Sequence, residues 1–116
     1  MMDEEHQIQK AIAQYLDIRG YCWWAVPNGG SRSLITATRL KAEGVKAGVP
    51  DITLIHNGMF YGIEVKKPKT STPMGRLTVK QKTMIRSIEG AGAEVGVVYS
   101  VADVIELLIE WDILGD

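Results

Sequence analysis

The sequence predicts an α/β fold in which a mixed four-stranded sheet is flanked by helices. Three observations predict this class. Helical and strand-like hydrophobic patterns alternate along the chain in the order α-β-α-β-β-α-β-α. Asn57-Gly58 separates two apolar runs and is the strongest short-range signal for an antiparallel hairpin. A helical segment after that hairpin allows the last strand to pair parallel with an earlier one through a crossover.

The first two elements are a helix and an aromatic strand. Residues 4–19 form a helix because Ile8, Ile12 and Leu16 recur at helical spacing. The following segment, residues 21–26, is rich in aromatic and branched side chains, and it therefore forms a strand.

The middle of the chain contains a second helix and the hairpin. Helical spacing of apolar residues predicts the second helix over residues 33–43, and Gly44 ends it. The hairpin strands cover residues 51–56 and 59–67, on either side of the Asn57-Gly58 turn. These strands supply the antiparallel part of the sheet.

The last third of the chain contains two capped helices and a strand between them. Thr78 caps a helix over residues 78–89, and the mostly apolar residues 94–99 form the fourth strand. Ser100 caps the last helix, residues 101–112. This helix is apolar enough to serve either as a core helix or as a dimer interface.

The chain has the length and composition of one globular domain over residues 1–116. Its single cysteine, Cys22, excludes an internal disulfide and a zinc site made only of its own cysteines. No stretch approaches the ~20 apolar residues of a membrane span, and the acidic N-terminus is unlike a signal peptide. We therefore expect a cytoplasmic protein of a bacterium or a phage-infected host cell, with no membrane partner.

Charge is distributed unevenly along the chain. The net charge is −1, yet residues 19–86 hold 12 of the 13 basic residues and only three of the 14 acidic ones. This asymmetry favours a polyanion partner such as DNA, unless the basic residues scatter over the folded surface. The residues assigned to DNA binding are Asn28, Arg32, Arg39, Lys46, Lys67, Lys69, Arg76 and Lys80.

The hairpin register brings two acidic residues together. A two-residue turn places Asp51 opposite Glu64, with Cβ atoms about 4.5–5.5 Å apart, and Lys66 on the same face. Opposed buried carboxylates repel, and a divalent cation between them removes the repulsion. Oxygen ligands favour Mg²⁺ or Mn²⁺ over zinc. The alternative is a simple salt bridge from Lys66, with Asp51 as a turn residue after Pro50.

A third acidic residue can come from the first helix. Glu5 extends the apolar stripe of that helix, so its carboxylate is placed to reach a metal on the sheet. The alternative is a favourable interaction with the helix dipole, and Glu4 is placed nearly as well.

Gln81 also has two readings. It points inward from its helix and can orient a water or contact a phosphate, but Thr78 and Gln81 also have the spacing of a capping box. We assign no metal role to His6 or His56.

Several of these residues together carry a resemblance to a known family. Pro50-Asp51 followed by Glu64-Val65-Lys66 matches the PD-(D/E)xK signature of a large nuclease superfamily. The chain more specifically resembles the VRR-NUC family of virus-type replication–repair nucleases. The further features that carry the resemblance are Glu5, the Val26-Pro27-Asn28-Gly29-Gly30 run, the stretch 40–51 before the hairpin, and Gln81.

The resemblance implies a fold, a site and an activity. The fold is restriction-endonuclease-like, with added helices at 33–43 and 101–112. The implied catalytic residues are Asp51, Glu64, Lys66 and Gln81. The implied ligands of Mg²⁺ or Mn²⁺ are Glu5, Asp51, Glu64 and the carbonyl of Val65. The implied activity is metal-dependent DNA endonuclease activity, selective for four-way (Holliday) junctions or other branched DNA in repair, performed by a homodimer. Alternatives are a sequence-specific or non-specific nuclease and a catalytically idle DNA-binding module.

Overall fold

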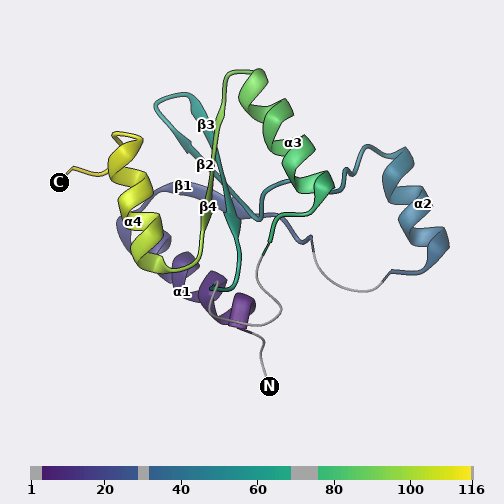
Figure 1. Ribbon diagram of the computed structural model, residues 1–116, viewed down its shortest axis with the longest axis horizontal. Coiled ribbons are helices and arrows are strands. Elements are labelled where there is room, and N and C mark those ends of the chain that lie inside the picture. Colours follow the sequence, from purple (N-terminus) through teal and green to yellow (C-terminus); the bar gives the residue numbers. More distant parts are fainter. Residues whose placement is uncertain (1–3, 29–31, 69–75, 116) are drawn as a thin grey trace.

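The computed structural model describes residues 4–28, 32–68 and 76–115, and it contains every predicted element in the predicted order (Figure 1). The elements are α1 (Glu4–Arg19), β1 (Cys22–Ala25), α2 (Leu34–Ala42), β2 (Ile52–His56), β3 (Met59–Val65), α3 (Val79–Gly90), β4 (Glu94–Val98) and α4 (Val101–Glu110). Their bounds agree with the predicted ones to within two residues. In the described part of the chain, no helix has the length and apolar character that crossing a bilayer requires.

The sheet is mixed, as predicted, and its strands lie in the order β1-β2-β3-β4. The first three strands are antiparallel neighbours, and β4 pairs parallel with β3 after the α3 crossover. The hairpin has the predicted register, with His56 opposite Met59 and Ile52 opposite Ile63. Asn57 and Gly58 both have positive φ, as a type I′ turn requires. The residues that come next beyond Ile52 and Ile63 are Asp51 and Glu64.

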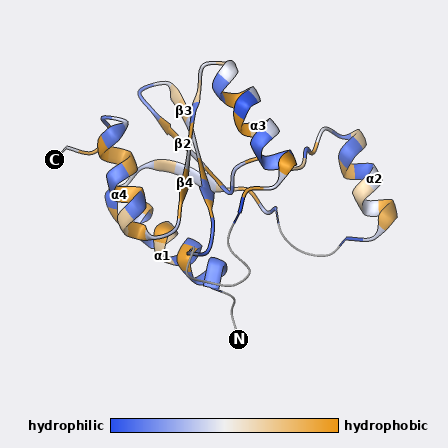
Figure 2. Cartoon of the chain, viewed as in Figure 1, coloured by the Kyte–Doolittle hydropathy of each residue, from blue (hydrophilic) through white to orange (hydrophobic). Residues whose placement is uncertain are grey.

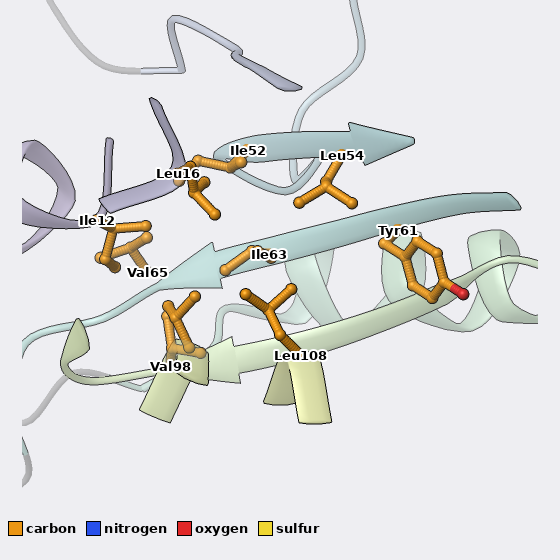
Figure 3. Close-up of a cluster of buried hydrophobic side chains, with 10 residues drawn as sticks. Ile12, Leu16, Ile52, Leu54, Tyr61, Ile63, Val65, Val98 and Leu108 are labelled. Carbon is orange, nitrogen blue, oxygen red and sulfur yellow. The ribbon is translucent and has the colours of Figure 1, made fainter. Parts of the chain in front are cut away.

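The hydrophobic core lies on one face of the sheet, beneath α1 and α4. Alternate residues of β3 point to this face, and they pack with residues of β2, β4 and the two helices (Figure 3). The members are Ile12, Leu16, Ile52, Leu54, Tyr61, Ile63, Val65, Val98, Val104 and Leu108. Each fully buried aliphatic side chain of this kind stabilises a fold by about 1.5–3 kcal/mol. This face therefore supplies most of the apolar burial.

The last helix is a core helix. Leu107 of α4 packs so closely on Gly96 that a Cβ there would lie 2.3 Å from the leucine Cδ2. The ring of Trp111 lies 4.6 Å from the ring of Tyr61, centroid to centroid. These contacts use the apolar side of α4 within the chain, which is the first of the two predicted roles of this helix.

The other face of the sheet is covered by α3 and carries polar residues (Figure 1). Glu64 alternates with the core residues of β3 and so points to this face. Pro50 packs on Gly62, where a Cβ would lie 2.8 Å from the proline Cγ. This contact holds the segment before β2 flat against the sheet and places Asp51 at the edge of the α3 face.

Helix α2 differs from what its periodicity suggested. It has no buried residue and projects from the sheet, although it carries hydrophobic residues (Figures 1 and 2). Leu34 and Ile35 are 82% and 83% exposed. The N-terminus of the helix is capped locally, because the Ser33 side chain accepts a hydrogen bond from the Thr36 backbone N–H.

Gly48 joins the loop before β2 to the N-terminal end of α3. Its φ is +86°, and a Cβ at this position would lie 2.5 Å from the carbonyl oxygen of Lys80. We expect Gly48→Ala to reduce the free energy of unfolding by roughly 2–4 kcal/mol, because backbone strain and a clash with main-chain atoms add. Denaturant unfolding measures this loss.

Gly44→Ala is the matched control. Gly44 also has positive φ, +105°, but an added Cβ there would meet nothing within 4 Å. Its loss should therefore be limited to the strain, about 1–2 kcal/mol. Equal losses in the two variants would show that the contact between the loop and α3 is not tight.

Candidate active site

Asp51 lies immediately before β2, and hydrogen bonds from two segments, the end of β3 and the stretch after β1, hold it in place. Its Oδ2 accepts a hydrogen bond of 2.8 Å from the Val65 backbone N–H. Its Oδ1 accepts one of 3.3 Å from the Asn28 side-chain amide. Its backbone carbonyl accepts another from the Val26 N–H at 2.8 Å. Donors to both carboxylate oxygens fix the orientation of this carboxylate.

Asn28 connects the segment after β1 to this carboxylate. Its side-chain amide donates to the Val49 carbonyl at 2.8 Å as well as to Asp51. Its own backbone N–H donates to the Val26 carbonyl, which turns the chain after β1. The sequence assigned Asn28 to DNA contact. In the structure its amide group donates hydrogen bonds to the loop that carries Asp51.

Glu64 lies on the α3 face of β3 and is only 2% exposed. Its Oε2 accepts a hydrogen bond of 3.1 Å from the Gln81 amide, whereas its Oε1 has no hydrogen-bond partner among the described residues. Burial, and after it the negative charge of Asp51, raise the pKa of Glu64 from 4.5 to about 9. The positive charge of Lys66 acts in the opposite direction on this pKa. Without a cation, Glu64 is therefore protonated at neutral pH.

Gln81 makes the capping box that its spacing allowed, and it also binds Glu64. Its Oε1 accepts from the Thr78 backbone N–H at 2.8 Å, and its own N–H donates to the Thr78 hydroxyl at 3.1 Å. These two bonds make the capping box of α3. The NH₂ of the same side-chain amide is not used by the capping box, and it donates to Glu64. One amide thus ties the start of α3 to the buried carboxylate.

Lys66 follows β3 and joins the same group. Its backbone N–H donates to the Val98 carbonyl at 2.9 Å, and its side chain is only 11% exposed. Its Nζ lies 4.0 Å from Glu64 Oε2, at the outer limit of an ion pair. The buried ammonium therefore lies beside Glu64 without a tight salt bridge to it.

Glu5 does not join the pair directly. It belongs to α1, on the opposite face of the sheet, and it borders a groove of about 640 Å³ that Asp51 also lines. Among the described residues, no group of three or more His, Cys, Asp or Glu side chains is arranged to hold a metal. Asp51 and Glu64 thus lie together, and Glu5 lies across the groove, near enough that its negative charge adds to the rise in the pKa of Glu64. His56 lies next to the hairpin turn, at the end of β2 away from Asp51, as the sequence predicted. Its ring contacts the Tyr21 ring.

Comparison with known proteins shows which family the chain belongs to. The sequence profile of the VRR-NUC domain matches residues 3–102. The chain belongs to the VRR-NUC family. VRR-NUC domains are nucleases of the PD-(D/E)xK type, and they generally use divalent metal ions. No curated protein matches the chain in sequence.

Solved structures with VRR-NUC names share the fold. One, described as a VRR_NUC domain protein, superimposes with a TM-score of 0.74 at 22% identity and covers 100% of this chain and 93% of its own. Another, described as a VRR_NUC domain, has a TM-score of 0.62 at 24% identity and covers 94% of this chain and 97% of its own. These similarities confirm the predicted fold class.

The VRR-NUC site in this chain has the chemistry of a divalent-cation site. Two carboxylates are adjacent, one of them is buried, and its Oε1 faces no donor among the described residues. Such an arrangement is unfavourable for two anions, and a hard cation with oxygen ligands relieves it. The residue set therefore fits the metal that the family uses.

The basic residues assigned to binding fall into two groups. Arg32, Arg39 and Lys46 are exposed on α2 and its flanks, where Arg39 also pairs with Glu43 at 3.3 Å. Around the end of β3 and the start of α3 lie Lys67, which is partly buried, and Arg76 and Lys80, which are exposed. Lys69 lies outside the described residues.

The raised pKa of Glu64 predicts how stability depends on pH. The metal-free folded chain keeps a proton on Glu64 up to about pH 9, whereas the unfolded chain loses it near pH 4.5. The stabilising contribution of that proton is full below pH 4.5 and is lost as pH rises toward 9. In EDTA at pH 8, Glu64→Gln should therefore be more stable than the wild type by roughly 1–3 kcal/mol.

Denaturant unfolding from pH 4 to pH 9 checks this expectation. The advantage of Glu64→Gln should grow with pH in EDTA and should disappear or reverse when Mn²⁺ is added to both proteins. Glu89→Gln, a change at an exposed position on α3, should show neither effect. A Glu64→Gln variant less stable than the wild type throughout would contradict the burial of an unpaired carboxyl.

Proposed function

We propose that this protein is an endodeoxyribonuclease that uses Mg²⁺ or Mn²⁺ to hydrolyse phosphodiester bonds in branched DNA. The observation that carries the proposal is the adjacency of Asp51 and the buried Glu64, with the Lys66 ammonium beside them. The basic surface next to the pair supplies the phosphate contacts. Membership of a nuclease family supports the reaction class.

Asp51 and Glu64 are the residues that would hold the cation. Asp51 keeps lone pairs free on two oxygens that are already oriented by Val65 and Asn28, and Glu64 presents Oε1. The Val65 carbonyl and Glu5 are the further ligands in this proposal. A bound divalent ion lowers the pKa of a water ligand and stabilises charge on the leaving oxygen.

Lys66 supplies a fixed positive charge at the reaction centre. A buried ammonium beside the metal ligands favours the negative charge that develops on the phosphate in the transition state. Its loose contact with Glu64, 4.0 Å, leaves it able to bind an incoming phosphate oxygen or the attacking water. We assign it this electrostatic role.

The two side-chain amides position the carboxylates. Asn28 holds Asp51, and Gln81 holds Glu64. Because each amide is itself anchored elsewhere, to Val49 and to Thr78, the carboxylates keep their orientation before DNA arrives. Preorganisation of this kind lowers the cost of assembling the site.

Contacts through phosphates suit recognition of DNA shape. The exposed basic residues meet phosphate oxygens, which position a duplex without reading its bases. Helix α2 carries part of this basic surface away from the sheet, so it can contact a second arm of a branched substrate. These features support structure selectivity over sequence specificity.

Removal of the Asp51 charge tests the site. Asp51→Asn keeps the side-chain shape, and we expect cleavage with Mg²⁺ or Mn²⁺ to fall at least about 100-fold, because the cation loses a charged ligand. Gel assays on labelled linear, flap and four-way junction DNA measure the rates. Glu89→Gln is the control and should cleave like the wild type. Cleavage that survives Asp51→Asn would end the assignment.

Two cuts in a junction require two sites, and we propose that the protein acts as a two-fold dimer through α2. A nine-residue helix is marginal alone, yet α2 exposes Leu34 and Ile35 almost fully. In this proposal the α2 helix of a second copy of the chain packs against these side chains and buries them. The apolar side of α4 packs within the core instead, as the contact of Trp111 with Tyr61 illustrates.

The Leu34→Glu/Ile35→Glu double variant tests the dimer. Sedimentation should show a dimer for the wild type and a monomer for the variant. The variant should nick a four-way junction without paired cuts, and the wild type should cut the junction at least about tenfold faster than a linear duplex of identical sequence. A monomeric wild type, or equal rates on both substrates, would contradict this part of the proposal.

A further inference from the structure

A groove leads away from Asp51 along α1, and its residues Gln9, Lys10 and Ala13 have no role in the proposed function. Its volume is about 640 Å³, within the range of sites that hold a nucleotide-sized ligand. Gln9, Lys10 and Ala13 line it from α1, and Val26 and Pro27 line it from the segment after β1. Asp51 and Glu5 border the same groove, so one end of it is continuous with the carboxylate pair.

The chemistry of the groove changes along its length. Near Asp51 it is acidic, which suits the cation that the pair would hold. Farther along α1 it presents the Gln9 amide and the Lys10 ammonium, both of them donors. Ala13, Val26 and Pro27 contribute apolar surface. Donors next to apolar surface match a sugar–phosphate unit, which is an anion joined to a largely apolar ring.

Lys10 stands out by its charge and its place. It is the one basic residue outside residues 19–86, and it lies in an otherwise acidic N-terminal segment. Along α1 it is five residues beyond Glu5, about 7.5 Å at the rise of a helix. This separation is comparable to the distance between neighbouring phosphates along one DNA strand. Lys10 is therefore placed to meet a phosphate near the one held at the metal end.

We propose that this groove binds the cleaved DNA strand beside the scissile bond, with Lys10 contacting a neighbouring phosphate and the apolar surface contacting the adjoining sugar. The inference rests on the proposed function, because it takes the scissile phosphate to lie at Asp51 and Glu64. It adds a binding subsite on the α1 side of the sheet, separate from the basic residues around α2 and α3.

A double-mutant cycle between protein and DNA tests the subsite. Wild type, Lys10→Ala and Lys10→Arg are assayed on junctions that carry one neutral methylphosphonate, moved through the three phosphates on either side of the cut. At one of these phosphates the modification should slow the wild type about tenfold. Lys10→Ala should be slowed about tenfold on unmodified DNA and no further by that modification. Lys10→Arg should behave like the wild type.

The control is Lys82→Ala, a lysine-to-alanine change at an exposed position on α3 outside the groove. It should remain sensitive to the same methylphosphonate. Wild-type cleavage combined with full sensitivity of Lys10→Ala at every position would overturn the subsite and leave the proposed function intact. Absence of metal-dependent cleavage by the wild type would instead overturn the proposed function, and the subsite with it.

Discussion

The structure depends on one unfavourable contact, the adjacency of Asp51 and Glu64. The hairpin register forces the two carboxylates together, and burial together with the charge of Asp51 raises the pKa of Glu64 to about 9. Neighbouring groups then act on this pair: backbone and Asn28 donors on Asp51, the Gln81 amide on Glu64, and the Lys66 ammonium. A fold that needed only stability would place apolar residues here. A divalent cation between the two carboxylates would relieve this repulsion.

One face of the sheet holds the hydrophobic core, and the other holds the polar residues of the candidate site. Core residues beneath α1 and α4 bury the apolar surface, so the α3 face can tolerate a strained polar group. Close backbone contacts keep that polar face rigid, since Gly48 touches the start of α3 and Pro50 packs on Gly62. The loop carrying Asp51 and the helix carrying Gln81 are therefore held against each other, and a change in either alters the geometry of the carboxylates.

The sequence predicted local features and missed those that depend on distant contacts. The Asn57-Gly58 turn determines the register by itself, so the juxtaposition of Asp51 and Glu64 followed from counting residues. The bond from Asn28 to Asp51 joins residues 23 positions apart, and no periodicity encodes such an approach. Periodicity likewise predicted α2 but not its exposure, because an apolar stripe does not determine which element, if any, packs against it. The helix stripe placed Glu5 toward the carboxylate pair, and its charge acts on the pKa of Glu64 across the groove.

Anomalous diffraction from crystals soaked with Mn²⁺ tests the central claim most directly. We expect an anomalous peak bonded to Asp51 and to Glu64 Oε1 at about 2–2.4 Å, the distance of oxygen ligands to a hard divalent ion. Gln81 should keep its bond to the other oxygen of Glu64, and Lys66 should stay clear of the ion. A map with no manganese at the pair, and with Lys66 closing into a salt bridge with both carboxylates, would contradict the claim that these residues form a metal site.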